Sequence, residues 1–169
     1  MITKMIGKGA FTRAYLMSSG RVLLKSCCPI KECMSMGWFP DSPLFPVLLQ
    51  VDAEVYEMDY YPKQRSLKNS LQPEHWQTYK TLKAAYDQGC LNLPKNIHDA
   101  YQHWYNVFEQ YLDGELQETM LEALDGCANC GSDIGFEISP RNVAVNSDGE
   151  LVLLDVFFSH SKLKEVRRK

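Results

Sequence analysis

Residues 135–157 read Gly-Phe-Glu-Ile-Ser-Pro-Arg-Asn-Val-Ala-Val-Asn-Ser-Asp-Gly-Glu-Leu-Val-Leu-Leu-Asp-Val-Phe. Within this segment, two apolar runs at 143–145 and 151–154 flank the sequence Asn-Ser-Asp-Gly. Short β-forming runs on either side of turn residues predict a β-hairpin. We expect the hairpin to bring together the polar residues that precede and follow it.

Three polar residues frame the hairpin, namely Glu137, Asn142 and Asp155. Phosphoryl transfer depends more on positioning and charge neutralisation than on covalent chemistry by the protein. In the pattern typical of protein kinases, which these residues resemble, an acid orients the attacking hydroxyl, an Asn five residues later holds Mg²⁺, and an Asp beyond a tight turn bridges metal and phosphates. The spacing therefore predicts a catalytic Glu137 with metal ligands Asn142 and Asp155. An ordinary hairpin after a polar loop also fits, because Asn and Asp are common turn residues.

A glycine-containing turn lies near the start of the chain and includes Gly7, Lys8, Gly9 and Phe11. Glycine has no Cβ, so its backbone can approach a phosphate closely. The turn predicts a nucleotide-binding loop, although a Gly-x-Gly pattern also occurs in plain turns.

A single lysine, Lys25, ends the apolar run Val-Leu-Leu at residues 22–24. A buried or half-buried lysine needs an anionic partner. We expect Lys25 to contact the nucleotide phosphates together with Glu32, the only carboxylate that follows soon enough. A solvated surface position for Glu32 is the alternative.

Two strand-like runs follow at 44–51 and 54–61, and Pro62 stops the second. They are the expected fourth and fifth strands of a sheet. The end of the second run is typical of a hinge whose backbone holds the adenine edge of a nucleotide, although an edge strand that ends at proline fits as well. The residues expected at the base are Met58, Asp59 and Tyr60.

Together these motifs resemble the protein-kinase fold, and most closely the early-gene serine/threonine kinases of T7-type bacteriophages. In that group the glycine loop reads Gly-x-Gly-x-Phe-x-x-Ala-Tyr, as residues 7–15 do here. The usual Asp-Phe-Gly is degraded in the group, and Asp155-Val-Phe157 is such a version. The resemblance covers most of the chain, with its motifs in order.

The resemblance implies an α+β fold of two lobes, with a small antiparallel β lobe at 1–62 and a mainly helical lobe at 63–169. It implies ATP- and Mg²⁺-dependent phosphorylation of Ser or Thr in host bacterial proteins, in the cytoplasm of the infected cell. The implied catalytic residues are Lys25, Glu137, Asn142 and Asp155, and the implied nucleotide-binding residues are Gly7, Lys8, Gly9, Phe11, Lys25, Glu32, Met58, Asp59 and Tyr60.

The chain departs from the kinase pattern at Glu137, where that pattern has Asp, and at Gly135-Phe136, where it has His-Arg. The segment after Asp155 is also short, which predicts no long substrate groove. A pseudokinase that binds nucleotide or a host protein without transfer is therefore the alternative to an active kinase. A fragment that works within an assembly, or an unrelated α+β module, also fits.

Apolar residues at helical intervals predict helices at 73–86, 97–112 and about 115–124. Their aromatic residues are expected to form a core. The net charge of −3 among 169 residues argues against nucleic-acid binding. We found no signal-peptide pattern and no apolar run long enough to span a membrane, so we expect a soluble intracellular protein.

Six cysteines are present, and only Cys127 and Cys130 have the spacing of a metal or redox pair. A second Cys or His pair at matching distance is missing from the sequence. We therefore expect free thiols in preference to structural zinc.

Overall fold

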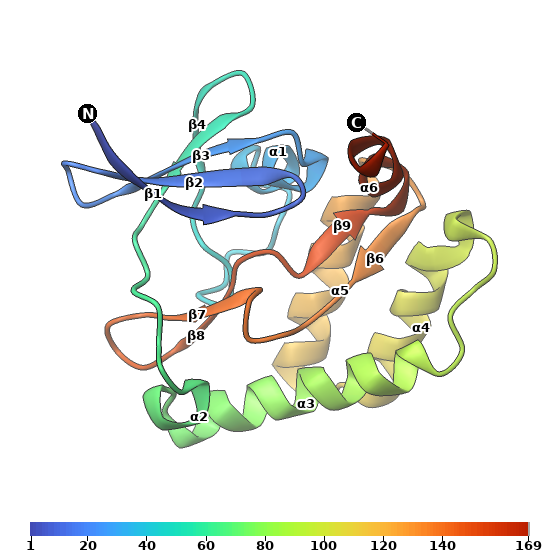
Figure 1. The fold of residues 1–169 in the computed structure, drawn as a ribbon. Coiled ribbons are helices and arrows are strands. Elements are labelled where there is room, and N and C mark those ends of the chain that lie inside the picture. Colours follow the sequence, from blue (N-terminus) through green and yellow to red (C-terminus); the bar gives the residue numbers. More distant parts are fainter. Residues whose placement is uncertain (169) are drawn as a thin grey trace.

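The computed structural model describes residues 1–168 and has an α+β fold (Figure 1). An antiparallel sheet of five strands comes first in the chain. In spatial order its strands are β1 (Ile2–Lys8), β2 (Thr12–Met17), β3 (Val22–Ser26), β5 (Val55–Met58) and β4 (Leu49–Asp52).

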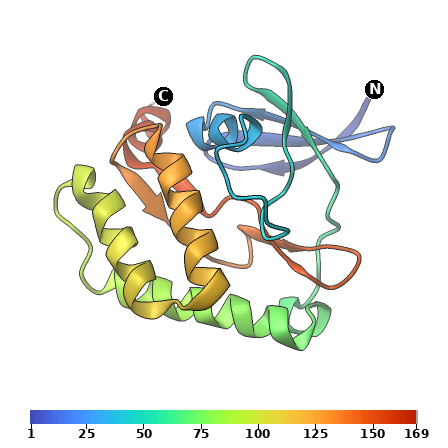
Figure 2. The same cartoon turned by 180° about the vertical axis from the view of Figure 1, so that it is seen from behind.

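The helices are mainly in the second part of the chain, and only α1 lies between two strands of the sheet. They are α1 (Pro29–Ser35), α2 (Leu67–Ser70), α3 (Pro73–Cys90), α4 (Ala100–Tyr111), α5 (Gly114–Ala128) and α6 (His160–Arg167), with a short 3₁₀ helix η1 (Ile97–Asp99) before α4. Seen from both sides, α3, α4 and α5 form a helical layer below the sheet (Figures 1 and 2).

Two small strand pairs lie between the sheet and the helical layer (Figure 1). Strand β7 (Val143–Val145) pairs with β8 (Leu151–Leu153), which confirms the predicted hairpin. Strand β6 (Ile134–Phe136) pairs with β9 (Phe157–Ser159), a pairing that the sequence did not indicate.

Two hydrophobic clusters hold the fold. The larger one contains residues from α1, α3, α4, α5 and the small strand pairs, including Trp104, Phe108, Phe136 and Phe157. The smaller one lies on the sheet and consists of Val22, Leu24, Leu48, Tyr56 and Met58. Helix α1 lies between β3 and β4 in sequence, yet its buried Ile30 belongs to the larger cluster.

The predicted helices are present with somewhat different ends. The helix expected to end before Gly89 continues to Cys90, because Gly89 lies inside it against the Trp104 ring, where an added Cβ would come within 2.4 Å of that ring. The predicted strands at 44–51 and 54–61 are shorter in the structure, as β4 and β5. Residues 44–48 contain Pro46 and carry Phe45 and Leu48 into the two clusters instead of pairing.

Within residues 1–168, none of the helices has the length and apolar character that crossing a membrane requires.

Candidate functional site

The three polar residues that frame the hairpin are held together by backbone hydrogen bonds. Glu137 N donates to Val156 O at 2.8 Å. The carbonyl oxygen of Asn142 accepts from both Leu154 N at 2.9 Å and Asp155 N at 3.2 Å. The amide nitrogen of the Asn142 side chain donates to Glu137 O at 3.3 Å. One network therefore joins the segments that carry Glu137, Asn142 and Asp155.

A lysine from α1 completes this cluster. Lys31 is only 4% exposed, its ammonium donates to Leu154 O, and its Nζ lies 3.4 Å from Asp155 Oδ1. The Asp155 side chain remains 43% exposed even though it contacts Lys31. Burial raises the pKa of the neighbouring Cys28 thiol to about 11 even though the positive charge of Lys31 acts in the opposite direction. Lys31 is therefore the cation at the site, with a neutral thiol beside it.

Lys25 does not lie in this cluster. Strand β3 buries Val22, Leu24 and Ser26 and exposes Lys25 on its other face. Lys25 Nζ lies 5.9 Å from the centre of the Tyr15 ring. Lys25 is exposed because alternate side chains of a strand point to opposite faces, and Leu24 and Ser26 on either side of it point to the buried face.

Glu32 also lies outside the cluster. It is exposed on α1, next to the buried Lys31, so the surface position considered from the sequence is the one that the structure has. The expected pairing of Lys25 with Glu32 is therefore replaced by the pairing of Lys31 with Asp155.

The glycine turn joins β1 to β2, and Gly9 N closes it by donating to Thr12 O at 2.8 Å. Phe11 packs against the larger cluster, and its carbonyl accepts from Cys27 N at 3.2 Å. Cys27 stands two residues before α1, so the turn is tied to the start of the helix that carries Lys31. Gly7 and the exposed Lys8 lie on β1.

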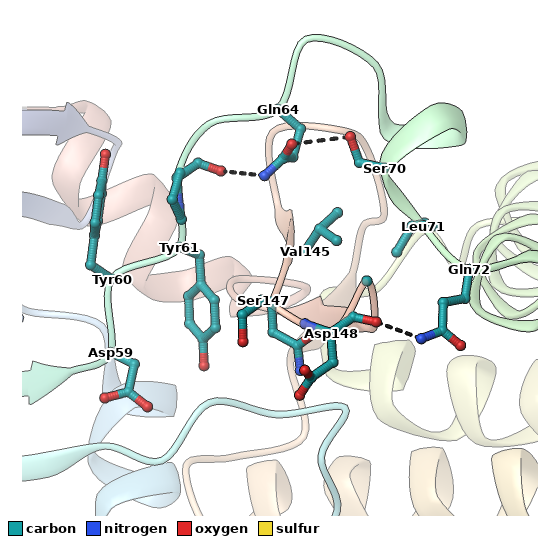
Figure 3. A pocket seen from close by; sticks show the side chains of 13 residues that line it. Asp59, Tyr60, Tyr61, Gln64, Ser70, Leu71, Gln72, Val145, Ser147 and Asp148 are labelled. Atoms are coloured by element: carbon teal, nitrogen blue, oxygen red, sulfur yellow. Dashed lines mark hydrogen bonds between the residues drawn. The ribbon is translucent and has the colours of Figure 1, made fainter.

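The predicted hinge leaves the sheet after Met58, which is buried in the smaller cluster. Asp59 and Tyr60 then line a hollow of about 1030 Å³ (Figure 3). Its other walls are the connection to α3 and the turn of the β7–β8 hairpin. The lining residues are Asp59, Tyr60, Tyr61, Pro62, Gln64, Ser70, Leu71, Gln72, Val145, Asn146, Ser147, Asp148 and Gly149.

Polar groups on the wall of this hollow are already paired with one another. Gln64 bridges Pro62 O and Ser70 Oγ, each at 3.0 Å, and Gln72 Nε2 donates to Asp148 O (Figure 3). The hollow lies against the turn of the β7–β8 hairpin. Asn142 and Asp155 lie at the other end of the hairpin, next to the first residue of β7 and just beyond the last residue of β8. The hollow and the polar cluster are therefore at opposite ends of one hairpin.

The oxygen atoms of Asp155 and Asn142 suit a hard cation such as Mg²⁺, which is often held by one or two carboxylates while phosphates and water supply the other ligands. Asn142 donates through its amide nitrogen, which leaves its side-chain oxygen as the possible ligand. Residues 1–168 contain no cluster of three or more His, Cys, Asp or Glu side chains placed to bind a metal.

Neither the known protein-family models nor the curated protein sequences contain a match to this chain.

Proposed function

We propose that the chain is an ATP- and Mg²⁺-dependent protein serine/threonine kinase with a kinase-like two-lobed fold, which acts on host bacterial proteins during bacteriophage infection. The observation that carries the proposal is the network joining Glu137, Asn142 and Asp155, with the buried Lys31 beside it. An acid, an amide, a second acid and a cation are the groups that phosphoryl transfer requires.

The arrangement of strands supports the two-lobed part of the proposal. A five-stranded antiparallel sheet with one helix inserted before its last two strands precedes a helical region, as the resemblance implies. The segment at 59–72 connects the two and lines the hollow beside the hairpin. In this proposal, the adenine contacts the backbone at Asp59 and Tyr60 at the edge of that hollow.

Each residue of the cluster then has a role that its position allows. Glu137 orients the hydroxyl of the substrate and accepts its proton. Asp155 and Asn142 hold Mg²⁺, which neutralises charge on the phosphates when it is bound. Lys31 takes the place expected for Lys25 and attracts the phosphate oxygens, because it is the buried cation next to Asp155. The glycine turn covers the phosphates from the side of the sheet.

One observation favours a second function, a pseudokinase that binds nucleotide or a host protein without transfer. The ammonium of Lys31 already neutralises Asp155, the carboxylate that a metal would need. In this reading the ion pair replaces the metal, and Glu137 has no chemical task. The two functions differ in whether Mg²⁺ strengthens nucleotide binding and whether phosphate is transferred.

The test is incubation of the purified protein with labelled ATP, Mg²⁺ and a bacterial extract. We expect the parent protein to label extract proteins, and Lys31→Ala and Asp155→Ala to reduce the rate by about 100-fold or more, because each removes charge complementarity to the triphosphate. Lys25→Ala is the matched control, since it removes an exposed lysine on β3 that lies outside the cluster, and its labelling rate should stay within about twofold of the parent.

The same samples separate the alternatives. Labelling by Lys31→Ala at the parent rate would refute the role of Lys31, and loss of labelling in Lys25→Ala alone would restore the original assignment. A parent protein that never labels a substrate but melts at higher temperature with ATP is a pseudokinase, because a ligand bound by the folded state raises its stability. Absence of both effects leaves an unrelated α+β module. In an active kinase, Glu137→Asp should keep or raise the rate of phosphate transfer. In a pseudokinase, the same variant should remain inactive.

A further inference from the structure

We propose that Cys33 and Cys130 are a redox modification site, at which a reversible disulfide joins α1 to the segment that follows α5.

The two residues are 97 positions apart in the sequence, yet their Sγ atoms lie 2.7 Å from each other. Cys33 is on α1 and is fully buried, whereas Cys130 comes two residues after the end of α5 and is half-buried. A disulfide has an S–S distance of about 2.05 Å, so the sulfurs need to approach by less than about 1 Å. The fold has therefore already brought together two thiols that are distant in sequence.

The two thiols are not equivalent. The hydrogen bond between the two thiols raises the pKa of Cys33 and lowers that of Cys130. Cys130 is also the more accessible of the two. A thiolate is the attacking species in thiol chemistry, so an external oxidant reacts first with Cys130 and the buried Cys33 resolves the product.

The other deeply buried cysteines lack this combination. Burial raises the pKa of Cys127 well above its ordinary value, and that of Cys28 to about 11. Both are buried thiols within the larger cluster, and inert thiols of this kind are typical of protein cores. In sequence, Cys127 and Cys130 have the spacing of a redox pair, whereas in the structure the thiol beside Cys130 is that of Cys33.

A low-molecular-weight disulfide such as oxidised glutathione supplies the oxidising equivalents. The Cys130 thiolate attacks one sulfur of glutathione disulfide, forms a mixed disulfide and releases one glutathione thiolate. Cys33 then loses its proton and attacks the Cys130 sulfur, which releases the second glutathione. Two protein thiols are oxidised while one glutathione disulfide is reduced to two thiols, and excess reduced glutathione reverses both steps.

The bridge has a consequence that rests on the proposed function. Lys31 lies on α1 two residues before Cys33, and its ammonium contacts Asp155. A bond from Cys33 to Cys130 fastens this helix to the helical layer and so fixes Lys31 at the cluster. Formation of the bond itself does not depend on phosphate transfer.

The experiment equilibrates the full chain in buffers with increasing ratios of oxidised to reduced glutathione, blocks free thiols by alkylation and maps the tryptic peptides by mass. We expect a cross-linked pair made of residues 32–63 and 96–141, which contain Cys33 and Cys130 respectively. The second peptide also contains Cys127, so fragmentation of the cross-linked pair is used to locate the bond. The bridge should raise the melting temperature by on the order of 10 °C, because it closes a long loop.

Matched variants give the control. Cys33→Ser and Cys130→Ser should remove the cross-linked pair and the shift in melting temperature, while Cys90→Ser, which changes a half-buried cysteine at the end of α3, should retain both. The proposal is overturned if the parent protein keeps Cys33 alkylated at every ratio, if the bond joins Cys127 to Cys130, or if Cys130 stops at the mixed disulfide. Each of these outcomes is read on the parent chain, so it does not depend on the folding of a variant or on kinase activity.

Discussion

The sheet and the helical part of this molecule are stabilised in different ways. The helical part rests on a core of packed rings, such as Phe108 and Phe136 with centroids 5.0 Å apart. The sheet has a small cluster of buried side chains, and its outer strands β1 and β4 are almost entirely exposed. The sheet therefore depends on strand pairing and on the contact made by α1, whereas the helical part is held by its own interior.

The largest expected effect tests this difference directly. Phe108→Ala empties the centre of the larger cluster and should lower the free energy of unfolding by about 3–5 kcal/mol. Leu24→Ala, in the smaller cluster beside partly exposed neighbours, should cost about 2–3 kcal/mol. Urea unfolding followed by circular dichroism measures both. An equal or larger loss in Leu24→Ala would show that the sheet has the stronger core.

A smaller effect concerns the buried Asp133, which fastens β9 and α6 by accepting from Ser159 Oγ at 2.9 Å and Ser161 N at 2.7 Å. Burial acts to raise the pKa of Asp133, but these hydrogen bonds outweigh it and hold the pKa below its ordinary value. A depressed pKa means that the ionised group stabilises the fold above the unfolded pKa of about 3.9, and that this contribution is lost as pH falls through the folded pKa.

Asp133→Asn should therefore lower the free energy of unfolding by about 1–2 kcal/mol at neutral pH. The difference in this free energy between the variant and the parent should become smaller below about pH 4. Urea midpoints between pH 7 and pH 3 measure it. A difference in urea midpoint that stays constant throughout this pH range would mean that the charge of Asp133 does not contribute to stability.

The smallest effect compares one surface ion pair from each part. Arg21 lies 2.8 Å from Asp59 and 3.5 Å from Glu57, where β3 begins and β5 ends, and Lys83 pairs with Asp87 along α3. Arg21→Ala and Lys83→Ala should each cost about 0.2–1 kcal/mol at low salt and less in 1 M salt, because exposed pairs are screened. A loss above this range for Arg21 alone would indicate that the sheet relies on its surface charges.

The elements with strong local patterns were predictable from the sequence. The β7–β8 hairpin and the three long helices have apolar residues at the expected period, and the structure confirms them. Strands β6 and β9 were missed because residues 137–156 separate them in sequence, so that no turn motif indicates their pairing. Gly135 of β6 indicates why this pairing is specific, since an added Cβ would come within 2.4 Å of the Phe158 ring.

The candidate site was predictable where residues are close in sequence. Glu137, Asn142 and Asp155 surround one hairpin, so its formation brings them together. The lysine was not predictable in the same way, because Val22, Leu23 and Leu24 are all apolar and do not indicate which face Lys25 occupies. Lys31 could have been considered, since it follows Cys28 by three residues and so shares its face of the helical turn.

The hairpin turn is also a structural anchor for α3. Gly149 has a φ of 78°, and its carbonyl accepts from the backbone N of Gln72, the N-cap residue of α3, at 2.9 Å. Hairpin tips are usually the safest places to graft a tag or a fluorescent label. Here such a graft would separate the candidate site from its supporting helix, whereas Gly20, in the turn between β2 and β3, has open space around it and is the better attachment point.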